Sequence, residues 1–170
     1  MSSSHTHVIV RPAVAGDLES IVERNMKLAQ ETEDKRLDRE TLRRGVTLAL
    51  ERPELARYFI AELDGRDVGQ LMITYEWSDW RCGMFWWIQS VYVDAAFRRV
   101  GVFRHLFRHA EELARSSGGC GLRLYVEEHN HQALATYRSA GMVPSGHLVY
   151  ELDWSHKAER AATKGQVDEL

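Results

Sequence analysis

Apolar residues recur along this chain with two different periods, which predict where strands and helices follow one another. Runs with the alternating or continuous apolar pattern of strands occupy 8–14, 58–63, 67–77, 84–93, 122–128 and 146–154. The run 84–93 is apolar almost throughout, as is typical of a strand covered on both faces. Asp64 and Gly65 separate two of the runs and form a strong signal for a hairpin turn.

Helical spacing of apolar residues predicts four helices between these runs. The first follows Asp17, the second begins at about Asp38 and stops at Pro53, the third begins at Gly101, and the fourth occupies 130–141. Glycines close to the ends of the third and fourth helices supply stop signals. The layout is α+β, a mixed sheet with helices on its faces.

Composition favours one compact domain. Of the 170 residues, 44% are hydrophobic and 28% are charged, and we assign 1–155 to the domain and 156–170 to a polar tail. The formal net charge of -3 provides no basic excess, so nucleic acid is not an expected partner. The sequence shows neither a long apolar run nor a signal peptide pattern, so we expect no membrane partner and a cytoplasmic location. Cys82 and Cys120 lie far apart and predict two reduced thiols.

Two arginines and a glycine lie between the strand 84–93 and the third helix. The first amides of a helix have no partner within it and carry a partial positive charge. Gly101 allows the backbone to approach a ligand closely, while Arg98 and Arg99 add fixed charge. This arrangement suits a pyrophosphate, although an exposed arginine pair before a glycine turn is also common in proteins that bind nothing. The glycine-rich motifs of P-loop and Rossmann folds do not occur.

A second motif follows the next strand. Asn130 and Tyr137 are seven residues apart and therefore share one face of a short helix, with Ala133 between them. In combination with Arg98 and Gly101, these residues make the chain resemble the GNAT superfamily of N-acetyltransferases. In that family R/Q-x-x-G-x-G/A holds the pyrophosphate of acetyl-CoA, and a later N-x-x-A-x-x-x-Y lies beside the pantetheine and the sulfur.

The resemblance covers roughly 8–153 and implies both a fold and a cofactor. The implied fold is a GNAT-like acyl-CoA N-acyltransferase fold, with a central mixed, mostly antiparallel sheet of six to seven strands and about four helices on its faces. The implied cofactor is acetyl-CoA. The residues expected to contact it are Val91, Tyr92, Val93, Arg98, Arg99, Val100, Gly101, Val102, Phe103, Arg104, Asn130 and Tyr137. Phe103 stands where the family prefers Gly or Ala, so its ring should point into the core.

Acetyl transfer from a thioester to an amine requires a neutral amine, a polarised carbonyl and a protonated leaving thiolate. We expect Tyr137 to be the general acid, since a tyrosine of pKa about 10 can protonate a thiolate whose acid has a pKa of about 8.5. A core tyrosine with a satisfied hydroxyl is the alternative. Asn130 is also a favoured helix N-cap, and this role is compatible with a place beside the coenzyme.

No motif identifies the general base or the acceptor site. The family often uses a Glu on the fourth or fifth strand, or an ordered water, so position favours Glu127 over Glu76, Asp79 and Glu128 as the base. The residues expected to bind the acceptor are Glu31, Glu33, Asp34, Glu76, Trp77, Asp79 and Trp80. Carboxylates and ring faces favour a cationic amine. A solvated acidic loop and ordinary hairpin packing are the alternatives.

We therefore predict an N-acetyltransferase that transfers an acetyl group from acetyl-CoA to a primary amine by direct attack. The acceptor is a small-molecule or peptide amine, and a homodimer is left open. The alternatives are a catalytically idle acyl-CoA-binding or regulatory module, and an interaction protein that keeps the fold. His105, His109 and Glu112 have a spacing that could ligate a metal, but they lie on the polar helix face, so no metal is expected.

Overall fold

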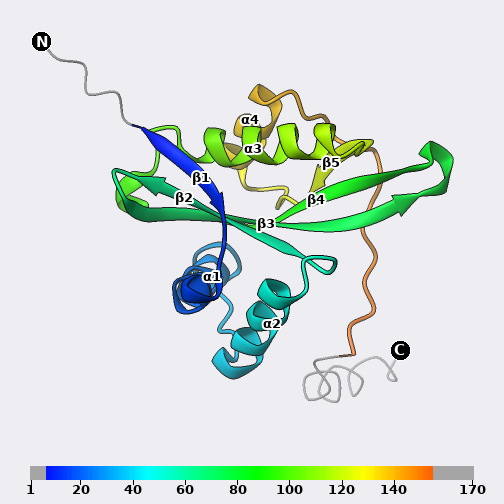
Figure 1. Cartoon of the computed structure of the whole chain (residues 1–170). Helices are drawn as coiled ribbons and strands as arrows, with labels where there is room; N and C mark the ends of the chain where they lie inside the picture. The colour runs from blue at the N-terminus through cyan, green and yellow to red at the C-terminus, as the bar shows by residue number, and fades with distance from the viewer. Residues whose placement is uncertain (1–6, 155–170) are drawn as a thin grey trace, which may run out of the picture. The chain divides into compact units, whose positions relative to one another are not determined.

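A mixed sheet of five strands is the framework of the candidate site. The computed structural model describes residues 7–154, and its strands lie in the order β1-β2-β3-β4-β5 (Figure 1). Their bounds are Val8–Pro12, Arg57–Leu63, Arg66–Ser78, Gly83–Val93 and Gly121–Leu124. Neighbours from β1 to β4 are antiparallel, and β4 pairs with β5 in parallel. The mixed, mostly antiparallel sheet is confirmed, with five strands in the described residues instead of six to seven.

The strand expected at 146–154 is the one that is missing. This segment has no strand structure, and the side chains of Leu148, Val149 and Tyr150 are exposed. An alternating pattern shows only that a segment fits a pleated surface, whereas a strand also needs a neighbour in register. The run 122–128 was likewise predicted too long, because only its first part lies in β5.

The hairpin predicted between β2 and β3 is confirmed. Asp64 and Gly65 have φ values of 51° and 75°, the left-handed backbone that a two-residue type I′ turn requires at both central positions. β3 then continues into a long second hairpin with β4, which is closed by the short 3-10 turn η2 (Asp79–Arg81) and projects beyond the helices (Figure 1).

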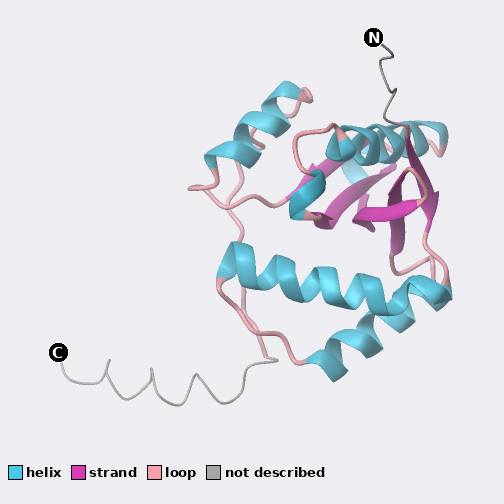
Figure 2. Ribbon diagram, turned by 90° about the vertical axis from the view of Figure 1, so that its left-hand side faces the viewer, coloured by secondary structure: helices cyan, strands magenta, loops and turns pink. Residues whose placement is uncertain are grey.

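Helices cover both faces of this sheet. α1 (Leu18–Glu33) and α2 (Arg39–Glu51) lie on one face, and α3 (Val102–Ser116) lies on the other (Figures 1 and 2). Each of these helices begins one residue after the residue predicted to start it. For α2 that residue is Asp38, whose side chain accepts from the Thr41 amide at 2.8 Å and is therefore the N-cap.

A separate apolar layer fills the space on each face. Between the sheet and the helix pair, the buried residues are Ile21, Val22, Val46, Tyr58 and Ile60. On the other face, α3 buries Val102, Leu106, Phe107, Ala110 and Ala114. The helix residues in the two layers have the spacing that predicted the helices, so the hydrophobic effect fixes the orientation of each helix on the sheet.

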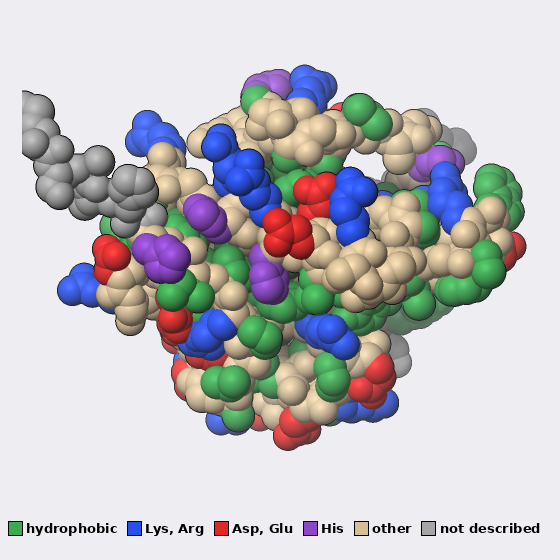
Figure 3. Space-filling view, turned by 45° about the horizontal axis from the view of Figure 1, so that its top comes forward, with side chains coloured by type: hydrophobic (Ala, Val, Ile, Leu, Met, Phe, Trp, Pro, Cys, Tyr) green, Lys and Arg blue, Asp and Glu red, His purple; other side chains and the backbone are tan. Residues whose placement is uncertain are grey.

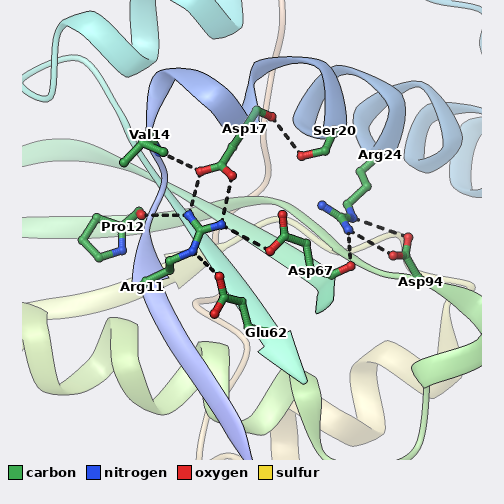
Figure 4. Close-up of polar contacts among 9 residues, drawn as sticks. All are labelled: Arg11, Pro12, Val14, Asp17, Ser20, Arg24, Glu62, Asp67 and Asp94. Atoms are coloured by element: carbon green, nitrogen blue, oxygen red, sulfur yellow. Dashed lines mark hydrogen bonds and ion pairs between the residues drawn. The ribbon is translucent and has the colours of Figure 1, made fainter. Parts of the chain in front are cut away.

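Arg11 of β1 joins four segments at one end of the sheet (Figure 4). Its guanidinium donates to Asp17 at 2.7 and 3.0 Å, and also to Glu62 on β2 and Asp67 on β3. Asp17 in addition accepts from the Val14 amide at 2.7 Å. Charge-assisted bonds of this kind are stronger than neutral ones, so the network fixes the start of α1 against the sheet.

Arg24 makes a second connection, from α1 to the end of β4 (Figure 4). This residue is only 6% exposed. Its guanidinium donates to the Asp67 carbonyl oxygen at 2.7 Å and to the Asp94 carboxylate at 3.1 Å. Asp94 is the first residue after β4, so Arg24 fixes the point at which the chain leaves the sheet toward α3.

The chain divides into two compact units, Met1–Tyr125 and Val126–Leu170. The first holds the sheet and α1 to α3, and the second holds α4 (His131–Ser139). A single domain over 1–155 stays a prediction, and the polar tail predicted at 156–170 lies outside the described residues.

Candidate functional site

β4 carries a bulge close to the point where its pairing with β5 ends. Two residues of β4 lie opposite Leu71 of β3, and Ser90 within this pair has a φ of 48°, which is uncommon for a residue with a side chain. β5 pairs with β4 only over Phe85–Ile88. Within the part of the chain that the structure describes, residues 89–93 of β4 are therefore not paired with β5. This part contains the predicted coenzyme contacts of the strand.

The turn between β4 and α3 has an anion-binding backbone. After the 3-10 turn η3 (Ala95–Phe97), both Arg99 and Gly101 take positive φ values, of 66° and 94°. The first helical hydrogen bond runs from the His105 amide to the Gly101 carbonyl at 3.2 Å. Turns that alternate in this way direct successive amides toward one side, next to the positive end of the helix dipole.

Arg98 is held from three sides. Its Nε donates to the Val93 carbonyl oxygen at 2.9 Å, and its Nη2 donates to Glu31 of α1 at 2.6 Å. The guanidinium carbon lies 5.3 Å from the centre of the Tyr92 ring. The Tyr92 hydroxyl donates to the other oxygen of Glu31 at 2.7 Å. The structure thus brings Glu31, which was predicted to bind the acceptor, to the predicted pyrophosphate arginine.

These contacts set the protonation of the cluster. The hydrogen bonds from Tyr92 and Arg98 hold the pKa of Glu31 below its usual range, so the carboxylate is ionised at neutral pH. Burial, together with the bond to Glu31, raises the pKa of Tyr92 to about 12. The tyrosine therefore remains a donor, and the carboxylate has a fixed donor on each oxygen.

The rest of the turn is mainly exposed. Arg99, Val100 and Arg104 have exposed side chains. The Phe103 ring packs on Phe107, with ring centres 5.9 Å apart, but it is only half-buried and is not among the buried residues of α3, so its place in the core stays a prediction. Figure 3, which looks toward the α3 side of the sheet, shows Arg and His side chains distributed over this face. Arg98, Arg99 and Arg104 therefore place positive charge within the turn and directly after it.

The second motif lies on α4 in the second unit. The Asn130 side chain accepts from the Ala133 amide at 3.0 Å, which confirms its role as an N-cap. Tyr137 is half-buried, and burial raises the pKa of its hydroxyl, which is consequently protonated at neutral pH. Glu127 has an exposed side chain, and its carbonyl oxygen accepts from the Asn130 amide at 3.0 Å.

The carboxylates predicted around the acceptor have individual partners. Lys35 donates to Glu33 at 2.6 Å, Gln30 donates to Asp34, and Asp79 accepts from the Trp80 amide at 2.9 Å. Trp77 and Trp80 are exposed in the β3–β4 hairpin, with 59% and 90% of their surface accessible. The structure therefore does not gather these side chains into one cluster.

Glu76 belongs to a different group, which sequence reasoning missed. It accepts from the Trp87 indole nitrogen at 2.5 Å and from Arg123 of β5 at 2.7 Å. The Arg123 guanidinium lies 3.8 Å from the centre of the Phe85 ring, and Trp87 packs on Tyr125 with ring centres 4.4 Å apart. These bonds hold the pKa of Glu76 below its usual range, so it is a poor proton acceptor near neutral pH.

No sequence signal could have found Arg123, because its partners depend on the register between β3, β4 and β5. Arg24 was detectable in principle. It lies on the same helix face as the apolar residue Ile21, and a charged residue on a buried helix face normally has a charged or hydrogen-bonding partner. Trp86 is 4% exposed and Trp87 is half-buried on the opposite face, which confirms that at least one belongs to the core.

The histidines and cysteines singled out in the sequence form neither a metal site nor a disulfide within the described residues. His109 packs edge-on against Phe59 with ring centres 4.9 Å apart, and residues 7–154 contain no group of three or more side chains placed to hold a metal ion. Cys82 and Cys120 are both unpaired thiols, as expected. None of the described helices is long and apolar enough to cross a membrane.

The mixed sheet with helices on both faces is an acyltransferase-like fold, and comparison with known proteins identifies the family. The chain matches the Acetyltransferase (GNAT) family over residues 18–142 and belongs to this family. A thialysine N-epsilon-acetyltransferase from Caenorhabditis elegans is 32% identical over 85 residues, which are 50% of this chain and 52% of that protein. The chain thus spans about half the length of this curated relative.

Solved structures agree with this assignment. A possible acetyltransferase from Clostridium difficile 630 has a TM-score of 0.81 and 41% identity, with 88% of this chain and 99% of that chain covered. The structure of AAC(6')-Iy in complex with a CoA-S-monomethyl-acetylneamine bisubstrate analogue has a TM-score of 0.70. It is 15% identical, covers 87% of this chain and 99% of its own, and shows likeness of fold alone.

Proposed function

We propose that this protein transfers an acetyl group from acetyl-CoA to a primary amine by direct attack of the amine on the thioester. The observation that carries the proposal is the turn from Arg98 to Gly101 at the start of α3, within the region that matches the family. A pyrophosphate needs hydrogen-bond donors and positive charge. The positive-φ backbone and the start of α3 supply amide donors, and the neighbouring arginines supply the charge.

The residues present fit the coenzyme. Gly101 is exposed, and apart from the adjoining backbone no atom lies within 4 Å of the place where a side chain would begin, so a phosphate can approach the backbone. The part of β4 at 89–93 extends beyond β5 and offers an edge to the amide groups of an extended arm. The coenzyme supplies the activated acetyl group, while Arg98 and the turn bind and orient it.

Tyr137 serves as the general acid in this proposal. The role follows from its spacing from Asn130, and burial raises the pKa of its hydroxyl, so the tyrosine carries its proton at neutral pH. Glu127 is proposed as the base because its exposed carboxylate can exchange protons with solvent. Glu76 is unsuited to this role, since Trp87 and Arg123 stabilise its charged form.

The acceptor that we propose is an amine carried by an amino acid. One relative is named for N-epsilon-acetylation of thialysine, which is an amino acid. In this chain, Arg123 lies half-buried beside the Phe85 and Trp87 rings and donates to Glu76. A guanidinium has five donor hydrogens in a planar fork, which suits a carboxylate of the acceptor as well.

Release of coenzyme A thiol, measured over a panel of amines with acetyl-CoA, tests the proposed function. The panel should pair thialysine with its decarboxylated analogue, since both present the same amine. We expect turnover with at least one amine and, for Arg123→Gln, a KM that rises more for the carboxylate-bearing member. A protein that binds acetyl-CoA but releases no thiol with any amine is the idle module instead.

A further inference from the structure

We propose that Glu31 is a positioning residue, which holds the Arg98 guanidinium in its pyrophosphate-binding orientation before the coenzyme arrives. This inference rests on the proposed function, because it assigns a role within the same coenzyme site. It also gives Glu31 a place on the coenzyme side, whereas the sequence had suggested contact with the acceptor.

The geometry fixes Arg98 more firmly than its exposure suggests. Its side chain is 44% exposed, and that of Glu31 is 42% exposed, so an isolated pair at this position would contribute little. Here, however, Nε is bound to the Val93 carbonyl, Nη2 is bound to Glu31, and the guanidinium lies near the Tyr92 ring. These contacts restrain both the position and the plane of the fork.

Glu31 is itself held in place. Tyr92 is 5% exposed and comes from the buried strand β4, so its hydroxyl provides a rigid support for one carboxylate oxygen. The other oxygen is then directed at Arg98. Tyr92 in the core therefore holds the Glu31 carboxylate, and the carboxylate in turn holds the Arg98 guanidinium. The remaining N–H groups of Arg98 can donate to an anion.

Two effects of Glu31 on an anionic ligand oppose one another. Its negative charge repels a phosphate, but the charge is largely compensated by Arg98 and screened by solvent. Its contact with Arg98 reduces the side-chain ordering that binding would otherwise require. We expect positioning to prevail, with coenzyme A affinity about 2- to 10-fold weaker in Glu31→Ala, which corresponds to about 0.4 to 1.4 kcal/mol.

Glu33→Ala is the matched control. Glu33 is two residues away on α1, and its exposed carboxylate pairs with Lys35 instead of Arg98. The two variants remove the same charge from the same helix end. Tyr92→Phe removes the hydroxyl that supports Glu31 and keeps the ring, so it should reproduce part of the Glu31→Ala loss.

The experiment is a double-mutant cycle on coenzyme A binding, measured by calorimetry with Glu31→Ala, Arg98→Ala and the double variant. Pantetheine, which lacks the pyrophosphate, is the second probe. We expect Glu31→Ala to weaken coenzyme A binding in the wild-type background, to have no further effect when Arg98 is absent, and to leave pantetheine binding unchanged. A loss of affinity that affects both probes, or that persists without Arg98, would show general structural damage and overturn the inference.

Remaining outcomes are equally decisive. Unchanged or tighter coenzyme A binding in Glu31→Ala, with normal binding by the wild type, overturns the positioning role and leaves the proposed function intact. A folded wild-type protein that binds no coenzyme A rejects the proposed function itself. An independent readout needs no coenzyme: the NMR signal of the Arg98 Nε proton should exchange with water faster in Glu31→Ala than in Glu33→Ala.

Discussion

The buried Arg24 guanidinium on α1 lies 3.1 Å from the Asp94 carboxylate, at the residue where the chain leaves β4. Arg24 also binds the Asp67 carbonyl oxygen at the start of β3. One side chain of α1 therefore anchors both the beginning of β3 and the turn that leads to the candidate pyrophosphate site. The stability of the fold and the geometry of the site are coupled through this pair.

Replacing Asp94 by alanine should lower the free energy of unfolding by about 1 to 3 kcal/mol, because the buried Arg24 charge loses its partner. Coenzyme A affinity should fall as well, since the turn loses its anchor. Urea unfolding and calorimetry measure the two effects. Glu51→Ala, which removes an exposed carboxylate at the end of α2, is the control and should change neither.

Asp17 should make the stability depend on pH. Hydrogen bonds from Arg11 hold the pKa of Asp17 below its usual value, so its contribution is present above the unfolded pKa of about 3.9 and is lost as pH falls through the lowered folded pKa. Asp17→Asn should cost about 1.5 to 3 kcal/mol at pH near 7. In urea titrations, this difference from the wild type should shrink below pH of about 4. A difference independent of pH would argue against the ion pair.

Gly101→Glu should weaken acetyl-CoA binding more than Arg99→Ala. A side chain at a φ of 94° strains the backbone and places bulk and charge where the phosphate must approach. Loss of the exposed arginine should cost only about 0 to 1 kcal/mol. Gly118→Glu is a matched control, because Gly118 also has a positive φ and open space but lies at the other end of α3. Equal affinities for the two glutamate variants would refute the phosphate assignment.

The pattern of apolar residues was sufficient to predict the strands from β1 to β4 and the starts of α1 to α3, and Asp64 with Gly65 predicted the hairpin. A helix or strand that is buried on one face has apolar residues at the repeat of that element, so burial leaves a readable pattern in the sequence. It failed at 146–154, where the pattern fits a strand but no partner strand lies in register. Register and burial also decide which charges meet. The pairs Arg98–Glu31 and Arg123–Glu76 join residues far apart in sequence, and no local pattern contains them.

Tyr137→Phe should separate an enzyme from an idle binder. The substitution keeps the ring and its packing but removes the proton donor, so acetyl-CoA affinity should hardly change, while kcat should fall by about 10²- to 10⁴-fold. Stopped-flow turnover and calorimetry give the two numbers. Should wild type and variant turn over equally, Tyr137 would be a packing residue and another group would supply the proton.

Direct acetyl transfer to an amine fixes the product balance of a single reaction, which can be measured. Free coenzyme A thiol and the acetylated amine are quantified together by mass spectrometry, in parallel with a sample that contains acetyl-CoA and the protein but no amine. We expect equal amounts of thiol and amide, and no acetyl group on the protein when the amine is omitted. Thiol without amide, or an acetylated chain that passes its acetyl group to the amine afterwards, would contradict it.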